Sequence, residues 1–365
     1  MLSCGEAKKI MNDLDQTIKH DETAKGLGGV NPLVVIRCLT YNHEPYIRDC
    51  LEGFVMQKTN FPFVAIVHDD ASTDHTADIV REYAEKYPDI IHPIFETENQ
   101  YSKRDGSLGR IMNEAIAATG CKYIAMCEGD DYWIDPLKLQ RQVEFLEEHE
   151  EYAICFHDVQ VWDESKKVLY PKSSLKDVPE ATTILDLAEE NYIHTPSVMY
   201  RYNKEAEQAQ IEIGPQPAGD YIKHMLYAEK GKIKKMTETM AVYRSGVGVW
   251  STMTGIEMVP KSIKVIMALM RYFTKDVTVH KALSFQLKCG IEVLREYSLN
   301  CPKAQKSITF RIGYKFAKKI MALMLRSANI SIVYKILHNQ LGYCVNALSR
   351  YVQKCSRLQN PASFG

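Results

Sequence analysis

The sequence contains no long hydrophobic run. Crossing a bilayer takes roughly 18 or more consecutive apolar residues, and the longest apolar stretches near the C-terminus are interrupted by Arg326 and Lys335. The opening residues, Met-Leu-Ser-Cys-Gly-Glu-Ala-Lys-Lys, have no apolar core of the kind found in secretory signals. We therefore expect no transmembrane helix, no secretion and a cytoplasmic location.

Paired cysteine motifs are also missing. The ten cysteines are scattered and include no C-x-x-C pair. Zinc sites and disulfide frameworks need closer or more regular spacing, so we expect reduced, mostly buried thiols. No G-x-G-x-x-G follows the first predicted strand, which argues against a dinucleotide-dependent oxidoreductase.

The net charge of −1 is small but unevenly distributed over the 365 residues. From Pro260 to the end, 18 lysines and arginines stand against three acidic residues, so the remainder is strongly acidic. A basic region of this kind suggests an anionic surface as its partner. No recognised nucleic-acid-binding motif accompanies the charge, so we expect no nucleic acid partner.

The first half of the chain alternates between strand and helix patterns. Apolar, β-branched runs are separated by segments with helical spacing of apolar residues, such as 108–119. This alternation predicts an α/β fold with a doubly wound, mostly parallel sheet flanked by helices. In such sheets, ligands bind beyond the carboxyl ends of the strands. The four runs expected to form strands are 33–36, 63–67, 90–95 and 123–126.

The second half is less regular. Strands are expected at 153–161 and 197–200 and a helix at 219–230, and from Pro260 onward the pattern is helical. One apolar stripe there has helical spacing and consists of Ile263, Ile266, Met267, Met270 and Phe273. We expect a leader (1–30), an α/β domain (31–255, divided into 31–142 and 143–255) and a basic helical region (256–365).

An acidic cluster follows the predicted strand at 123–126. Glu128, Asp130 and Asp131 fall within four positions, and like charges this close cannot all stay ionised unless a cation neutralises them. A hard divalent ion, Mn²⁺ or Mg²⁺, with open positions for a phosphate-bearing substrate would serve. The alternative is a polar turn, because Gly-Asp pairs are common in turns.

Two further motifs follow the first two predicted strands. After the second strand, Asp70 could accept the N3–H of a uracil, while Ser72 or Asp74 could instead cap the next helix. After the first strand, Leu39-Thr40-Tyr41 could contact the ribose and stack on the base, or Tyr41 could pack locally.

Taken together, the three motifs resemble those of inverting family 2 glycosyltransferases of the GT-A fold. The resemblance covers residues 32–250 and is strongest over 32–142, where Glu-Gly-Asp-Asp-Tyr-Trp-Ile-Asp looks like bacterial members that build surface polysaccharides. It implies metal-dependent transfer of a sugar from a nucleoside diphosphate donor, with UDP the expected nucleotide. The implied acceptor is a glycan or a lipid-linked glycan.

The resemblance also implies residue roles. Asp70 resembles the base-binding aspartate, and Asp130 and Asp131 resemble the ribose- and metal-binding carboxylates. Glu128 stands where the family has an aspartate, and its longer side chain changes its reach as a metal ligand. Asp220, in the pair Gly219-Asp220, resembles the carboxylate that deprotonates the acceptor, although it could merely cap a helix.

The segment Tyr243–Trp250 lacks the histidine that completes metal coordination after a Tyr-Arg pair in some related enzymes. Arg244 is expected instead to contact the diphosphate. Gly246 and Gly248 would permit a mobile loop that brings Trp250 near the sugar. His194 could line an acceptor pocket or belong to the core.

Three alternatives stay open. The tail carries lysines beside apolar stripes, as in 316–325, and would either bind an anionic membrane near a lipid-linked acceptor, at the inner face of the cell membrane, or pack on itself. A sugar nucleotidyltransferase would also use paired acids around Mg²⁺, but it usually has a glycine-rich basic loop after the first strand. A non-catalytic module would bind a nucleotide sugar without releasing the nucleotide.

Overall fold

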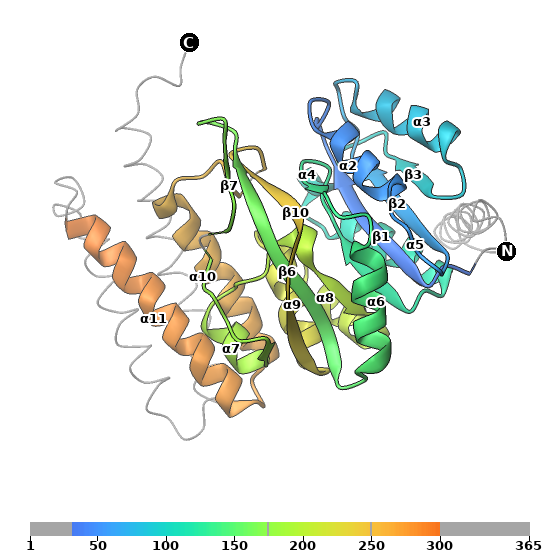
Figure 1. Ribbon diagram of the computed structural model, residues 1–365. Coiled ribbons are helices and arrows are strands. Elements are labelled where there is room, and N and C mark those ends of the chain that lie inside the picture. Colours follow the sequence, from blue (N-terminus) through green and yellow to red (C-terminus); the bar gives the residue numbers. More distant parts are fainter. Residues whose placement is uncertain (1–30, 174, 249, 300–365) are drawn as a thin grey trace, which may run out of the picture.

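The computed structural model describes residues 31–173, 175–248 and 250–299 (Figure 1). Their strands form one ten-stranded sheet with the order β3-β2-β1-β4-β9-β6-β10-β5, to which β7 and β8 attach at β6 and β10. The predicted leader and the tail beyond residue 299, including 316–325, lie outside the described residues.

The first half of the sheet is parallel, as predicted. Strands β2 and β4 flank β1, and β3 extends the sheet beyond β2. The expected strands are all present, and only the short helix α4 was not expected. The elements are β1 (Val34–Thr40), α2 (Ile47–Val55), β2 (Phe63–Asp69), α3 (Thr76–Lys86), β3 (Ile91–Phe95), α4 (Gln100–Lys103), α5 (Ser107–Thr119) and β4 (Tyr123–Met126).

The second half mixes strand directions. Strand β9 runs antiparallel to β4 and β6, whereas β6 and β10 are parallel. The elements are β5 (Tyr132–Trp133), α6 (Lys138–Glu148), β6 (Tyr152–Asp163), β7 (Val168–Tyr170), β8 (Ala181–Thr182), α7 (Ile184–Glu189), η1 (Thr195–Ser197), β9 (Met199–Arg201), α8 (Lys204–Ile213), α9 (Gly219–Ala228) and β10 (Lys232–Ser245).

The strand expected at 197–200 is displaced. Residues Thr195–Ser197 form a short 3-10 turn, η1, with Pro196 inside it, and the strand begins at Met199. Proline fixes φ near the helical value and donates no backbone hydrogen bond, so it favours the turn over the strand ladder.

Helices cover both faces of the sheet. Alternate residues of β1 point to opposite faces, so Val35 belongs to one hydrophobic cluster and Ile36 to the other. The cluster around Val35 includes residues of α5, α8 and α9, whereas that around Ile36 includes residues of α2, α3 and α6. A sheet buried on both faces explains why the strands read as continuous apolar runs.

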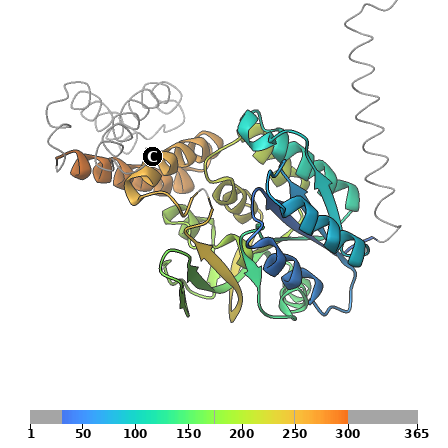
Figure 2. The same ribbon diagram turned by 90° about the horizontal axis from the view of Figure 1, so that it is seen from above.

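Two long helices, α10 (Gly255–Tyr272) and α11 (Val277–Leu299), lie at the side of the molecule away from β3 (Figures 1 and 2). The predicted apolar stripe of α10, from Ile263 to Phe273, is buried against the same cluster as α9. For this part of the basic region, the apolar face is therefore used in packing. Of the helices within the described ranges, none has the length and apolar character required to cross a membrane.

The thiols of the described residues are free. Cys38, Cys50, Cys121, Cys127 and Cys155 are buried, and Cys289 is exposed. The expectation of reduced, mostly buried cysteines agrees with this arrangement.

Candidate functional site

The three predicted motifs meet at the carboxyl ends of β2, β1 and β4. These strands are neighbours in the sheet, with β1 in the middle. The loops that follow them are joined by backbone hydrogen bonds, from Asp70 N–H to the Thr40 carbonyl (3.0 Å) and from Gly129 N–H to the Leu39 carbonyl (2.9 Å). The topology therefore brings together the segments that sequence alone had placed about 90 residues apart.

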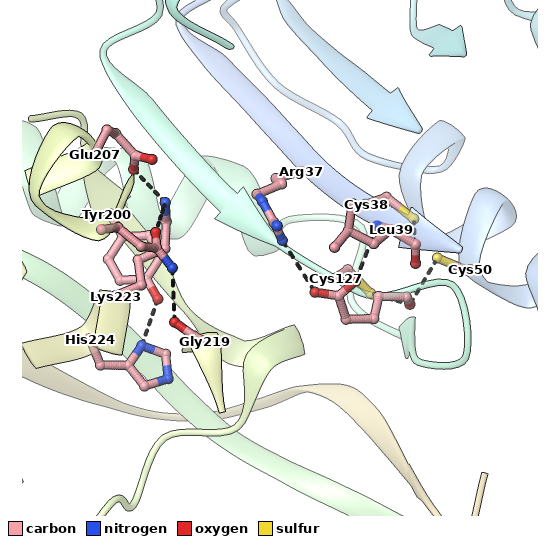
Figure 3. A network of polar contacts seen from close by, with 12 residues as sticks. Arg37, Cys38, Leu39, Cys50, Cys127, Tyr200, Glu207, Gly219, Lys223 and His224 are labelled. Atoms are coloured by element: carbon pink, nitrogen blue, oxygen red, sulfur yellow. Dashed lines mark hydrogen bonds and ion pairs between the residues drawn. The ribbon is translucent and has the colours of Figure 1, made fainter. Parts of the chain in front are cut away.

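Glu128 is held by protein donors. Its carboxylate accepts hydrogen bonds from the Arg37 guanidinium (3.3 Å) and the Leu39 N–H (3.1 Å). Both donors are on β1 and are labelled in Figure 3. Burial raises the pKa of Glu128 to about 7, against the opposing charge of Arg37. Glu128 therefore ties the acidic loop to β1.

Asp131 is also held by a protein donor. It is only 2% exposed, and its Oδ1 accepts the backbone N–H of Arg244 at 2.7 Å. Burial, and next the charge of Asp130, raise the pKa of Asp131 well above its usual range. Asp131 thus joins the acidic loop to the end of β10.

Asp130 differs from both neighbours. Its side chain makes no hydrogen bond or ion pair to another described residue, although the residue is only 8% exposed. Gly248 approaches it closely, since a Cβ on Gly248 would lie 2.9 Å from Asp130 Oδ2. Asp130 is therefore the member of the cluster best placed to take a ligand from outside the chain.

The expected three-carboxylate metal site is not formed as one cluster. Among residues 31–173, 175–248 and 250–299, no three His, Cys, Asp or Glu side chains are grouped to hold a metal ion. The reason is local, because Glu128 and Asp131 turn toward protein N–H groups. The donor chemistry still fits a hard cation at Asp130, provided that phosphate oxygens complete the ligand set.

Asp70 caps a helix. Its two carboxylate oxygens accept the backbone N–H groups of Gln100 (2.6 Å) and Tyr101 (3.0 Å) at the start of α4. The sequence predicts capping by Ser72 or Asp74 but not by Asp70, because it gives no signal for the short helix α4. An ionised carboxylate offers about four lone-pair sites, so these two bonds leave acceptor capacity for a base.

The loop after β1 is shaped by side-chain bonds to the loop after β2. Asn42 has a left-handed φ of 54°, and its backbone N–H donates to Ser72 Oγ at 2.9 Å. Asp74 accepts the N–H of Thr76, the first residue of α3, at 3.0 Å. Tyr41 is 43% exposed at the tip of this loop, so its ring is accessible for stacking.

Gly129 lies where no side chain fits. A Cβ there would lie 2.7 Å from Thr40 Oγ1 and 2.9 Å from His43 Nδ1. These two atoms are buried and have no hydrogen-bond partner among the described residues. His43 was not singled out from the sequence, because a single histidine in a loop follows no pattern.

Arg244 has partners other than the expected diphosphate. Its guanidinium donates to the Asp130 carbonyl oxygen (2.8 Å) and forms an ion pair with Asp49. It also lies 4.5 Å from the centre of the Tyr132 ring and 5.1 Å from that of Tyr46. Arg244 therefore clamps the acidic loop to the start of α2, a role that only the fold reveals.

The segment after β10 passes the acidic loop. Gly246 has a left-handed φ of 90°, and Gly248 lies against Asp130. Trp250 is half-buried, and its carbonyl accepts the N–H of Met253 at 3.2 Å. The position of the Trp250 ring relative to a bound sugar stays a prediction.

Asp220 is the second residue of α9. The N-cap position belongs to Ala218, which makes no side-chain cap, so Asp220 does not have the capping role considered as its alternative. Burial raises the pKa of Tyr243, and the charges of Asp131, Asp130 and Asp220 raise it further. Asp220 is therefore close enough to the acidic loop for the charges of both to act on one side chain.

His194 packs on Tyr243 and lines a small hollow. Its ring packs 4.7 Å from that of Tyr243, and its Nε2 is 2.6 Å from Ser173 Oγ. Burial lowers the pKa of His194 to about 4. The hollow is lined in part by His157, Ser173, Tyr192, His194 and Lys235.

Comparison with known families gives a match over the site. The model of the family described as Glycosyl transferase family 2 matches residues 37–209. The prediction of a family 2 glycosyltransferase is confirmed over this part of the chain, which contains the end of β1, all of β2 and β4, and the acidic loop.

Two relatives illustrate the range of similarity. An uncharacterised protein of Mycobacterium tuberculosis is 39% identical over 217 residues, 58% of this chain and 59% of the relative. The putative teichuronic acid biosynthesis glycosyltransferase TuaG of Bacillus subtilis is 33% identical over 117 residues, 32% of this chain and 43% of that protein. The chain thus matches about three fifths or less of the length of these relatives.

Solved structures agree in fold. Residues 1–349 of S. aureus TarS superpose with a TM-score of 0.55 at 17% identity, covering 91% of this chain and 93% of that one. The same protein in complex with UDP gives a TM-score of 0.53, and in complex with UDP-GlcNAc 0.55. The predicted GT-A type of α/β fold is therefore confirmed.

Proposed function

We propose that this chain, with its family 2 glycosyltransferase domain over residues 37–209, transfers a sugar from a nucleoside diphosphate donor to a glycan or lipid-linked glycan, with inversion. One observation carries the proposal. The carboxylate of Asp130 lies where three strand ends meet, and it has no hydrogen-bond or ion-pair partner among the described residues. The charge of Asp220, on α9, acts on the same Tyr243 side chain as the charge of Asp130.

The donor would bind along the ends of β1 and β2. Tyr41 is exposed for stacking on the base. The Leu39 carbonyl accepts the N–H of Gly129 in the acidic loop, and the Thr40 carbonyl accepts the N–H of Asp70. Asp70 would accept the N3–H of uracil with a lone pair that its two backbone bonds leave available. The TarS complexes with UDP and UDP-GlcNAc support UDP as the nucleotide.

A divalent cation, Mn²⁺ or Mg²⁺, would be held chiefly by Asp130 together with diphosphate oxygens. Asp131 keeps the loop in place through its bond to the Arg244 N–H, and Glu128 does the same through Arg37. When bound, such a cation supplies neutralising charge for the departing diphosphate. The chain's own part is to hold Asp130 in a loop fixed at both of its flanks.

Asp220 would act as general base. Inversion requires the acceptor hydroxyl to attack the anomeric carbon from the face opposite the diphosphate while losing its proton. Asp220 is the second residue of α9, a helix that packs on one face of the sheet. The proton would pass to the Asp220 carboxylate as the new glycosidic bond forms and the bond to the diphosphate breaks.

The acceptor and the location of the enzyme follow from weaker observations. TuaG, named for teichuronic acid biosynthesis, supports a role in polysaccharide biosynthesis with a surface glycan as acceptor. The 18 lysines and arginines after residue 259 support peripheral attachment at the inner face of the cell membrane.

A thermal-shift panel tests the proposal. UDP-glucose, UDP-galactose, UDP-N-acetylglucosamine and GDP-mannose are added with and without Mn²⁺, and nucleotide release is then followed for any that stabilise the protein. We expect one UDP-sugar to raise the melting temperature only with Mn²⁺ and to release UDP. Stabilisation without nucleotide release would indicate a binding module, and pyrophosphate release from UTP and a sugar phosphate would indicate a nucleotidyltransferase.

A further inference from the structure

The start of α9 lacks a side-chain cap, although it carries the proposed base. Ala218 occupies the N-cap position and has no side-chain oxygen. Uncapped first turns leave backbone N–H groups unsatisfied and fray easily. A base in such a turn must be kept in place by contacts elsewhere.

Those contacts come from α8, the helix before it in the chain. Gln210 Nε2 donates to the carbonyl of Gly219, the residue before Asp220, at 2.9 Å. The Oε1 of the same side chain accepts from Lys223 Nζ at 3.3 Å. One amide group thus binds both the backbone beside Asp220 and a side chain one turn later.

Lys223 is in turn fixed by a buried ion pair. Its side chain is 3% exposed and is paired with Glu207, whose side chain is 6% exposed (Figure 3). The pKa of Glu207 is lowered, since Lys223 and the Tyr227 hydroxyl outweigh its burial. The Tyr227 hydroxyl donates to Glu207 at 2.7 Å. Glu207 thus remains ionised and keeps Lys223 in one position.

A second anchor joins α9 to the sheet. His224 Nδ1 lies 2.6 Å from the Tyr200 hydroxyl, and Tyr200 pairs with Ile124 of β4. Strand β4 leads directly into the acidic loop. Helix α9 is therefore bonded to α8 through Lys223 and to β9, the neighbour of β4 in the sheet, through His224.

We infer that Gln210, Lys223 and Glu207 are positioning residues that hold the first turn of α9, and with it the Asp220 carboxylate, at a fixed place relative to the acidic loop. The inference rests on the proposed function. An ion pair that only packed α8 on α9 could be exchanged for apolar side chains. The distinguishing contact is the one from Gln210 to the Gly219 carbonyl.

The replacement Gln210→Glu isolates that contact. Glutamate keeps the shape and an oxygen for Lys223 but cannot donate to the Gly219 carbonyl. The matched control is Gln208→Glu, which adds the same charge on the exposed face of α8. Lys223→Met alone could unfold the protein by leaving Glu207 unpaired, so the ion pair is tested by the double replacement Glu207→Gln and Lys223→Met.

Two measurements are made on the full chain. The first is UDP release, assayed with the nucleotide sugar of the panel that the wild type turns over. In Gln210→Glu, kcat should be at least tenfold lower than in the wild type, whereas KM for the donor and affinity for UDP should stay within twofold. In Gln208→Glu, kcat should stay within twofold. Hydrogen exchange of the amides at 220–223 should be faster in Gln210→Glu and unchanged in the control.

The outcomes separate this inference from the proposed function. If no nucleotide sugar is turned over by the wild type, the proposed function fails, and the exchange rates alone decide whether Gln210 fixes the first turn. If Gln210→Glu keeps wild-type kcat and exchange, the positioning role is wrong. A parallel loss of UDP affinity and melting temperature would also overturn it, because it would indicate a general structural effect.

Discussion

At the scale of single residues, the acidic motif consists of three carboxylates in three environments. Glu128 is bonded to β1, Asp131 to the end of β10, and Asp130 to neither. Carboxylates that are neighbours in the sequence therefore do not share the same environment. Asp130, whose carboxylate has no protein partner among the described residues, is the one expected to bind the cation.

Replacing Asp130 should be more damaging to activity than replacing Asp131. We expect Asp130→Asn to lower UDP release by roughly a hundredfold or more, at least about 2.7 kcal/mol in the barrier, with little change in melting temperature. Asn at position 131 can still accept the Arg244 N–H and removes a charge whose burial is costly, so Asp131→Asn should retain more activity and equal or greater stability. Equal losses of activity in the two variants would contradict this division of roles.

Lys138 predicts a dependence of stability on pH. Its Nζ is buried, donates to Gln142 at 2.6 Å and lies 4.1 Å from the centre of the Trp133 ring. Burial lowers its pKa from 10.5 to about 7. Between these values the unfolded chain binds more protons than the folded chain, so the contribution of Lys138 to the free energy of unfolding rises with pH.

The matched test is Lys138→Met, which keeps the apolar stem and removes the titration. Urea unfolding at pH 7 and pH 10 should show the free energy of unfolding of the wild type rising relative to the variant, by up to about 4 kcal/mol. An identical change with pH in both proteins would indicate that Lys138 titrates normally in the folded state.

Residue roles were only partly predictable from sequence. Motif spacing placed Asp70 and Asp130 at one edge of the sheet, because the strands before them are parallel, whereas Asp220 came only from the resemblance to a family. It could not reveal that Arg244 contacts Tyr46 and Tyr132, since these tyrosines lie about 200 and about 110 positions before it in the chain. Such contacts depend on side-chain packing, which a linear pattern does not encode.

At the scale of elements, the acidic loop depends on close backbone approach at Gly129. The atoms that a Cβ would meet belong to Thr40 and His43, in the loop after β1. The loop therefore requires glycine at this position because there is no room for a side chain. The backbone conformation is not the reason, since the φ of Gly129 is not positive.

The variant Gly129→Ala should distort the acidic loop. Overpacking of this kind costs about 1–3 kcal/mol, and the displaced Asp130 should bind UDP and Mn²⁺ at least tenfold more weakly. The matched control is Gly109→Ala in α5, where a Cβ meets nothing within 4 Å. It should raise stability by up to about 1 kcal/mol. Thermal unfolding and UDP titration check both, and wild-type UDP affinity in Gly129→Ala would contradict the account.

Elements with strong periodicity were predicted well, and elements set by contacts were not. The α10 stripe and the strands β1, β2 and β4 agree with the patterns because burial on one or both faces fixes their composition. The four-residue helix α4 was not predicted, because it is too short to show a period. In addition, the backbone N–H of its first residue bonds to Asp70, about 30 residues earlier in the chain.

At the scale of the whole molecule, the charge asymmetry remains the main feature outside the site. The described helices α10 and α11 pack on the domain through their apolar faces, which leaves exposed lysines such as Lys264, Lys281 and Lys288 available to an anionic surface.

Vesicle binding tests this surface. The full chain should cosediment with phosphatidylglycerol vesicles at low salt and much less with phosphatidylcholine vesicles. Binding should fall severalfold at 0.5 M salt, where charges are screened within about 4–5 Å. Equal binding to the two lipids, or binding that salt does not affect, would contradict an electrostatic attachment.

The α/β fold could be predicted from the alternation of strand and helix patterns in the first half of the chain. The strands of the second half were predicted less completely. The antiparallel strand β9, inserted between β4 and β6, has three residues and follows the 3-10 turn η1. A segment this short has no readable period, so its place in the sheet is set by the strands on either side.

The most direct test of the account is a Mn²⁺ titration followed by electron paramagnetic resonance, in which only free Mn²⁺ gives the sharp signal. With UDP present, the wild type should remove one equivalent of Mn²⁺ from the signal, and without UDP it should bind far less. Asp130→Asn should lose this UDP-dependent binding. Unchanged Mn²⁺ binding in that variant, or binding that ignores UDP in the wild type, would contradict a cation site built from Asp130 and a diphosphate.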